Sequence, residues 1–173
     1  MRWRPPPEKS SPYVTVAGLR RLRSELKGLW PSRREVVAAL SAAAAEGDRS
    51  ENAEYIYRKK QLREMDRRIR YLQKRLDQLQ PVTVAPGDRE RIFFGARVQV
   101  EDQHGTVSCY RIVGPDEIGQ APEYISVDSP VARALLGRQR DEEVSVPVPE
   151  GERRLVVLAI DYPGDDTDDK PVS

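Results

Sequence analysis

Apolar residues recur every three or four positions between residues 13 and 45, so the pattern predicts a long amphipathic helix. Thr15 stands where it can cap the N-terminus of this helix. Pro31 lacks the amide hydrogen that an inner helical turn requires, so we expect a kink or a short break near Trp30. The alanines at 42–45 would allow a second helix to approach closely.

A second helix is predicted from about Ser50 to Gln80, where Pro81 ends it. Its apolar seam has the alternating steps of three and four that define a heptad pattern, at Leu62, Met65, Ile69, Leu72, Leu76 and Leu79. Only a short polar turn, residues 46–52, separates the two helices. The simplest packing is therefore an antiparallel coiled-coil hairpin ~45 Å long with that turn at its free end.

After residue 90 the apolar spacing changes to that of strands. Strands are predicted at 92–100, 106–113, 124–127, 143–148 and 154–161, with a short helix from Ser129-Pro130 to Leu136. The predicted fold class is α+β, with an N-terminal antiparallel coiled-coil hairpin followed by a small α+β domain. The predicted divisions are a flexible arm (1–12), the hairpin (13–81), a linker (82–90), the α+β domain (91–163) and an acidic tail (164–173).

Composition excludes several classes of protein. No apolar run approaches the ~18–20 residues of a membrane span, and no secretory h-region follows the N-terminus, so we expect a cytoplasmic protein without a membrane partner. The sequence has one cysteine, Cys109, and one histidine, His104. These single residues exclude an intramolecular disulfide and a thiolate-cluster zinc site, and they disfavour a histidine-based catalytic triad.

Charge is distributed unevenly along the chain. Residues 1–80 carry 19 basic and 10 acidic side chains, a net charge of +9, whereas residues 81–173 carry 10 and 18, a net charge of −8. The two halves are therefore expected to meet different partners, with nucleic acid the natural candidate for the basic half.

Acidic residues gather around the predicted turn, at Asp48, Glu51 and Glu54. One interpretation is helix capping, because Asp48-x-x-Glu51 fits a capping box and acids favour the positive end of a helix. A capping turn does not, however, require a rod ~45 Å long to carry it. The other interpretation is chemical, because two carboxylates could help to hold a hard cation such as Mg²⁺ if the remaining ligands came from elsewhere.

A basic run follows the turn, with nine bases in residues 58–75 against Glu64 and Asp66. Four of these bases step by four, three and four and so share one helix face: Arg63, Arg67, Arg70 and Lys74. A solvated flank of a coiled coil would alternate in sign, so the pattern favours contact with phosphates. Tyr55 and Tyr57 could either stack on bases or pack into the core.

Together these residues closely resemble the bacterial Gre transcript-cleavage factors. Residues 47–55 (Gly-Asp-Arg-Ser-Glu-Asn-Ala-Glu-Tyr) are similar to the tip signature of that family, and the basic run at 59–72 is similar to its GreB branch. The C-terminal domain of the family is matched at residues 93–96, 110–118 and 124–137. The resemblance covers about residues 13–163 and leaves the arm and the tail outside.

The resemblance implies a mode of action. An FKBP-like C-terminal domain would dock on RNA polymerase through Asp128 and Pro130, while the coiled coil enters the secondary channel. Asp48 and Glu51 would be the catalytic and metal-holding pair, which shares Mg²⁺ with the polymerase and orients the water that cleaves the 3′ part of a backtracked nascent RNA. The extruded RNA would lie on the basic face, which consists of Arg58, Lys59, Lys60, Arg63, Arg67 and Arg70. The chain would act as a monomer that binds no cofactor tightly by itself and stimulates hydrolysis intrinsic to the polymerase.

Three alternatives remain at the level of sequence. The chain could be a Gre homologue that blocks the polymerase channel without cleavage, although retention of Asp48 and Glu51 argues against this. A peptidyl-prolyl isomerase would need an aromatic-lined pocket, for which the C-terminal half offers few aromatic residues. A general coiled-coil nucleic-acid-binding protein would bind RNA without polymerase, and more weakly as salt rises.

Overall fold

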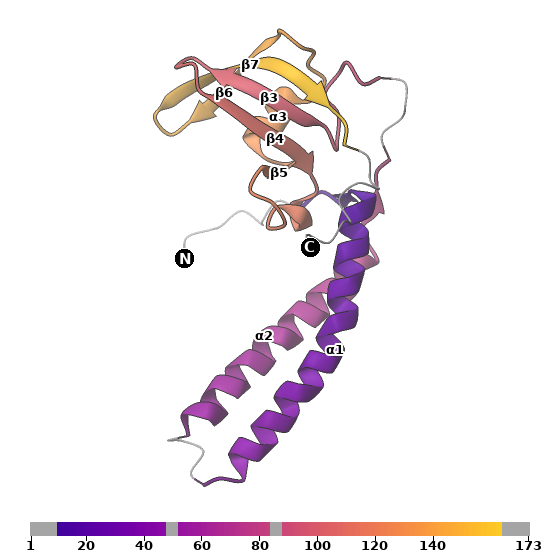
Figure 1. Ribbon diagram of the computed structural model, residues 1–173, viewed down its shortest axis with the longest axis vertical. Helices are drawn as coiled ribbons and strands as arrows, with labels where there is room; N and C mark the ends of the chain where they lie inside the picture. Colours follow the sequence, from indigo (N-terminus) through magenta and orange to yellow (C-terminus); the bar gives the residue numbers. More distant parts are fainter. Residues whose placement is uncertain (1–9, 48–51, 84–87, 164–173) are drawn as a thin grey trace, which may run out of the picture. The chain divides into compact units, whose positions relative to one another are not determined.

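The computed structural model describes residues 10–47, 52–83 and 88–163 (Figure 1). It divides into two compact units, one of residues 19–79 and one formed by the chain up to Gly18 together with the chain from Gln80 onward. The elements in chain order are β1 (Tyr13–Val14), α1 (Val16–Ala44), α2 (Ala53–Leu76), β2 (Gln80–Pro81), β3 (Arg97–Asp102), β4 (Val107–Val113), η1 (Pro115–Glu117), β5 (Tyr124–Ser126), α3 (Pro130–Leu135), β6 (Glu143–Val148) and β7 (Gly151–Asp161). Within the described ranges, no helix is long and apolar enough to cross a membrane.

Helices α1 and α2 form an antiparallel hairpin (Figure 1). Three polar contacts join residues whose positions run in opposite directions along the two helices, namely Glu25 to Arg68, Arg33 to Asp66 and Ala43 to Asn52. The apolar seams of both helices supply the buried side chains between them, among them Leu22, Val36, Ile69 and Leu72. Burying each such side chain contributes about 1.5–3 kcal/mol, so the seam rather than helix propensity holds the hairpin. The predicted coiled-coil hairpin is confirmed.

Helix α1 continues through Pro31, so the break predicted near Trp30 does not occur. A proline inside a helix costs about 3 kcal/mol. Leu22 lies before the proline and Val36 after it, and both are buried in the hairpin seam, so tertiary packing offsets that cost. Ser32 Oγ also donates a hydrogen bond of 3.1 Å to the carbonyl oxygen of Gly28 in the same part of the helix.

The ends of the hairpin differ from the sequence prediction, because a small parallel sheet forms there. Tyr13 pairs with Gln80 and Val14 with Pro81. The amide of Gln80 donates to the carbonyl of Pro12 at 2.7 Å, which takes Gln80 out of the helical hydrogen-bond ladder. Helix α2 ends at Leu76 rather than near Gln80, and Tyr13 belongs to a strand, whereas α1 begins at Val16, directly after the predicted cap Thr15.

The C-terminal unit contains a five-stranded sheet in the order β5-β4-β3-β7-β6. Strands β4 and β5 are parallel, and the other neighbouring pairs are antiparallel. The predicted strand at 92–100 begins later, at Arg97, because Gly95 adopts a φ of 87° in a turn that precedes β3.

Helix α3 packs on one face of this sheet and closes its core. Strand residues alternate between buried and more exposed positions along β3 and β6, as one covered face requires. The buried cluster takes side chains from α3, from the four strands β3, β4, β6 and β7 and from the segment before β3, including Ile92, Val98, Val100, Ile112, Ala132, Leu135, Val144, Leu155 and Val157. This core presents the turn before α3 on a rigid support.

Candidate functional site

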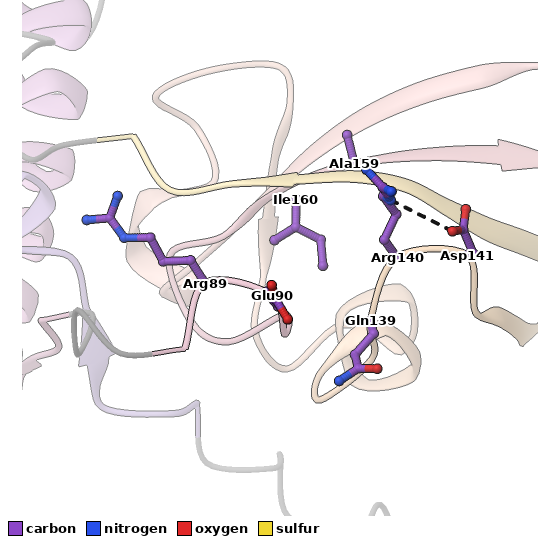
Figure 2. Close-up of a pocket in the computed structure, with 7 residues that line it drawn as sticks. All are labelled: Arg89, Glu90, Gln139, Arg140, Asp141, Ala159 and Ile160. Atoms are coloured by element: carbon purple, nitrogen blue, oxygen red, sulfur yellow. Dashed lines mark ion pairs between the residues drawn. The ribbon is translucent and has the colours of Figure 1, made fainter.

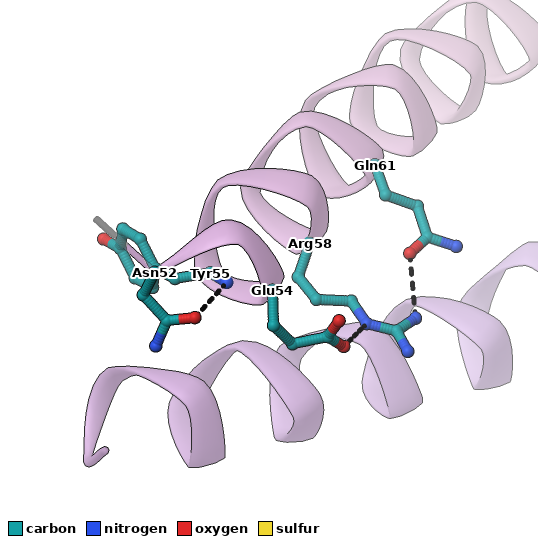
Figure 3. A network of polar contacts seen from close by, with 5 residues as sticks. All are labelled: Asn52, Glu54, Tyr55, Arg58 and Gln61. Atoms are coloured by element: carbon teal, nitrogen blue, oxygen red, sulfur yellow. Dashed lines mark hydrogen bonds and ion pairs between the residues drawn. The ribbon is translucent and has the colours of Figure 1, made fainter. Parts of the chain in front are cut away.

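Asn52 joins the two helices at the tip of the hairpin (Figure 3). Its Oδ1 accepts a hydrogen bond of 3.1 Å from the amide of Tyr55, and its extended backbone is that of an N-cap residue. Its Nδ2 donates a hydrogen bond of 2.8 Å to the carbonyl oxygen of Ala43, in the last turn of α1. The Asn52 side chain thus binds a backbone amide in the first turn of α2, which lacks a partner within the helix, and a backbone carbonyl near the end of α1.

Asp48 and Glu51, the predicted catalytic and metal-holding pair, lie outside the described residues. The neighbouring structure nevertheless bears on the capping interpretation. Asn52 is the N-cap of α2, and Glu54 supplies an acidic side chain in its first turn. Helix α2 therefore has its cap and its favourable N-terminal charge without a capping box at Asp48-x-x-Glu51.

Most of the predicted RNA-binding bases are exposed on α2. Lys59, Lys60, Arg63, Arg67 and Arg70 are exposed, as is Lys74 farther along the helix. Arg58 differs from them, because its Nε donates to Glu54 Oε1 at 2.8 Å and its Nη1 donates to Gln61 Oε1 at 3.1 Å (Figure 3). The structure therefore fixes Arg58 within the helix surface and presents the other bases to solvent.

Helix α1 takes part in balancing the charge of the basic run. Arg33 Nε donates to Asp66 Oδ1 at 2.7 Å, and this hydrogen bond together with the negative charge of Asp66 raises the pKa of Arg33. Arg68 donates to both carboxylate oxygens of Glu25, at 2.7 and 2.9 Å. Asp66 is thus engaged by α1, and Glu64 is the other acid in the sequence between residues 58 and 75. The exposed face keeps a positive charge.

Asp128, predicted to dock on polymerase, lies in the turn before α3 and contacts the N-terminal segment. One carboxylate oxygen accepts a hydrogen bond of 2.9 Å from the amide of Ser11, and the other accepts one from the Ser11 hydroxyl. Pro130, the second predicted docking residue, is exposed in the first turn of α3, which Ser129 caps. Ser11 was expected to belong to a flexible arm, because the polar, proline-rich start of the chain has no periodicity that could reveal this contact.

Glu117 is a buried carboxylate that the sequence did not single out. Only 1% of its surface is exposed. It accepts hydrogen bonds from the Thr15 amide at 3.0 Å, from the Thr15 hydroxyl and from the Gly114 amide at 2.8 Å. A side chain at Gly18 would overlap this carboxylate. Glu117 therefore fastens the first turn of α1 to the segment before η1, and its three donors offset the cost of burying it.

A pocket of about 500 Å³ lies beside β7 (Figure 2). Its lining is largely polar and includes Arg89, Glu90, Gln139, Arg140 and Asp141. Arg140 Nε lies 3.8 Å from Asp141 Oδ2. The lining contains neither a predicted site residue nor an aromatic ring, so this pocket does not support a prolyl isomerase.

Family models match both units of the chain. The model described as transcription elongation factor, N-terminal, matches residues 12–80, and the model described as transcription elongation factor, GreA/GreB, C-term, matches residues 87–162. The hairpin and the sheet domain are therefore those of a bacterial transcription elongation factor, and the chain belongs to the GreA/GreB family.

Similar curated proteins narrow the assignment within that family. The chain is 56% identical over 163 residues to transcription elongation factor GreB of Xanthomonas axonopodis pv. citri, covering 93% of this chain and 97% of the relative. It is 53% identical over 163 residues to GreB of Pseudomonas aeruginosa, covering 94% and 97%. The crystal structure of GreA factor homolog 1 of Thermus thermophilus is 26% identical, with a match that covers 86% of this chain and 97% of that chain at a TM-score of 0.39. The factor is of the GreB type.

Proposed function

We propose that this elongation factor binds RNA polymerase, inserts its coiled coil into the secondary channel and stimulates cleavage of the nascent RNA in backtracked complexes. The observation that carries the proposal is the start of α2. That helix is capped by Asn52, so the two carboxylates just before it, Asp48 and Glu51, are not needed to begin it. Because capping does not require these two acids, a role in holding a metal ion explains them best.

The carboxylate oxygens of Asp48 and Glu51 fit Mg²⁺, which prefers hard oxygen ligands. Two carboxylates make an incomplete site, so the polymerase and the RNA would supply the remaining ligands. When bound, Mg²⁺ polarises the phosphate and activates water. The contribution of this chain is to add negative charge near the metal and to orient a water by accepting its hydrogen bond. The hydrolysis itself would belong to the polymerase.

Two other parts of the chain would bind the RNA and the polymerase. The exposed bases of α2 would neutralise phosphates of the extruded 3′ segment, and this attraction weakens as salt rises. The turn that holds Asp128 and Pro130 would dock on the polymerase. Because the tip and the docking turn belong to different compact units, chemistry and affinity should be separable by mutation.

The experiment uses stalled, backtracked elongation complexes with 5′-labelled RNA and Mg²⁺. Asp48→Asn and Glu51→Gln are expected to abolish stimulated cleavage and leave polymerase binding almost intact, since each change removes a charge and keeps the shape. Glu54→Gln is the matched control, because Glu54 pairs with Arg58 on the helix surface and is expected to retain cleavage. Full cleavage by both tip variants would refute the metal-positioning role.

The same assay distinguishes the proposed function from two alternatives. A factor that only blocks the channel would bind polymerase without shortening the RNA. A general RNA-binding protein would bind the RNA equally well without polymerase. Incubation of the factor with RNA alone is expected to give no cleavage, as a factor that depends on the polymerase active centre requires.

A further inference from the structure

Two tyrosines of α2 stand in line with its exposed bases. Tyr57 is 59% exposed and Tyr71 is 43% exposed, so neither packs in the core of the hairpin. From Tyr57 the steps three, four, three, four and three lead along one helix face through Lys60, Glu64, Arg67, Tyr71 and Lys74. The exposed basic face is thus interrupted by two aromatic rings, ~21 Å apart along the helix.

Each ring is accompanied by an arginine whose position is fixed. The guanidinium of Arg58 lies 5.5 Å from the centre of the Tyr57 ring, and that of Arg68 lies 5.5 Å from the centre of the Tyr71 ring. Glu54 holds the first arginine and Glu25 of α1 holds the second. The cation–π contacts therefore restrict the rings while leaving much of their surface in solvent.

We propose that Tyr57 and Tyr71 are stacking sites for the bases of single-stranded RNA. This inference rests on the proposed function and adds base contacts to the phosphate contacts of the basic face. Positive charge next to exposed rings is the combination that binds single strands, because the charge follows the backbone and a ring accepts any base. A duplex hides the faces of its bases, so the occupant is the extruded single strand.

Because the rings are spaced along the helix, extruded RNA segments of different lengths would contact them. At ~3.4 Å per stacked nucleotide, ~21 Å corresponds to about six nucleotides. Tyr57, which is nearer the tip, would stack on short extruded segments. Tyr71 would be reached only by segments about six nucleotides longer. The second ring would therefore act in deeply backtracked complexes.

The first test needs no polymerase. The full chain is mixed with a single-stranded RNA oligonucleotide that contains 2-aminopurine, whose fluorescence falls on stacking. The wild type and Tyr57→Phe, which keeps the ring, are expected to quench the probe, whereas Tyr57→Leu is expected to bind about 5- to 10-fold more weakly and to lose quenching. Trp30→Leu removes an exposed aromatic side chain from α1 and is expected to match the wild type.

The second test uses complexes backtracked by increasing lengths. Tyr71→Leu is expected to reduce the cleavage rate only for long extruded segments, and Tyr71→Phe is expected to restore it. Absence of quenching by the wild type, or equal binding and quenching by Tyr57→Leu and the wild type, overturns the stacking site at Tyr57. Equal cleavage by Tyr71→Leu and the wild type at every length overturns the one at Tyr71. Absence of stimulated cleavage by the wild type overturns the proposed function instead, and the oligonucleotide test then still decides the stacking.

Discussion

At the scale of single residues, the tip depends on an amide side chain rather than on a carboxylate. Asn52 can donate and accept at once, and it uses both abilities to join Ala43 of α1 to Tyr55 of α2. A carboxylate at this position could accept from Tyr55 but could not donate to a carbonyl. The geometry of the helix ends on either side of the predicted catalytic pair is therefore set by Asn52.

This dual role predicts the behaviour of Asn52 variants. Asn52→Ala should lower the free energy of unfolding by about 1–3 kcal/mol, because a cap and a cross-helix hydrogen bond are both lost. Asn52→Asp keeps the cap and loses the donor, so its free energy of unfolding should lie between those of the wild type and Asn52→Ala. Urea unfolding and the cleavage assay are the measurements. If Asn52→Asp matched the wild type in unfolding and in cleavage, the hydrogen bond to Ala43 would contribute to neither stability nor activity.

At the scale of elements, α2 presents two different surfaces. Its apolar seam packs on α1, and its other face carries exposed bases, among them Lys60, Arg67 and Lys74. Arg68 and Asp66 are engaged by Glu25 and Arg33, which leaves the exposed face positive. Exposed ion pairs of this kind contribute little to stability, so their main effect here is on the sign of the surface.

The basic face predicts a dependence on RNA length. Arg63, Arg67 and Arg70 changed together to Gln should spare cleavage of short backtracked segments and reduce cleavage of long ones, because longer segments place more phosphates along the face. Glutamine has a helix propensity near that of arginine, so the hairpin should fold. Complexes backtracked by increasing lengths, each at two salt concentrations, provide the measurement. An equal loss at all lengths would indicate a folding or docking defect instead.

The buried Glu117 gives a prediction about the start of α1. Glu117→Gln would present an amide NH₂ group to donors that need an acceptor, so the free energy of unfolding should fall by about 1–3 kcal/mol. Glu150→Gln, at an exposed position in the turn before β7, should leave stability unchanged. Urea unfolding of both variants is the comparison. Equal stability would show that the contacts of Glu117 with Thr15 and Gly114 do not hold this segment.

At the scale of the whole molecule, charge and chemistry are divided between two units. The basic N-terminal half carries the tip and the basic face, whereas the acidic C-terminal half carries Asp128 and Pro130, the predicted docking residues. Ser11 contributes to that turn from the other end of the sequence, by two hydrogen bonds to Asp128. The predicted docking turn is therefore joined by the fold to the N-terminal segment of the chain.

Variants of the predicted docking residues should lose affinity for polymerase, whereas the tip variants should lose cleavage at unchanged affinity. Asp128→Ala and Pro130→Ala should weaken polymerase binding, so that lost cleavage returns at high factor concentration. Ser11→Ala should weaken binding about 3- to 10-fold, because one hydrogen bond that orients Asp128 is lost. Ser10→Ala, at an exposed neighbour, is the control. Unchanged affinity for core polymerase in the Asp128 and Pro130 variants would place the docking surface elsewhere.

The sequence by itself determined the long helices and the strands of the larger sheet, because their signals are local. The heptad seam from Leu62 to Leu79 predicts α2 and its partner, and the tip motif and the basic run lie within short stretches of chain. Tertiary structure decided what depends on distant pairing. Ser11 and Asp128 are 117 positions apart and Thr15 and Glu117 are 102 apart, and no periodicity links residues so separated. Packing likewise decided that α1 continues through Pro31 and that Tyr57 faces solvent, because burial depends on what the rest of the fold places beside a residue.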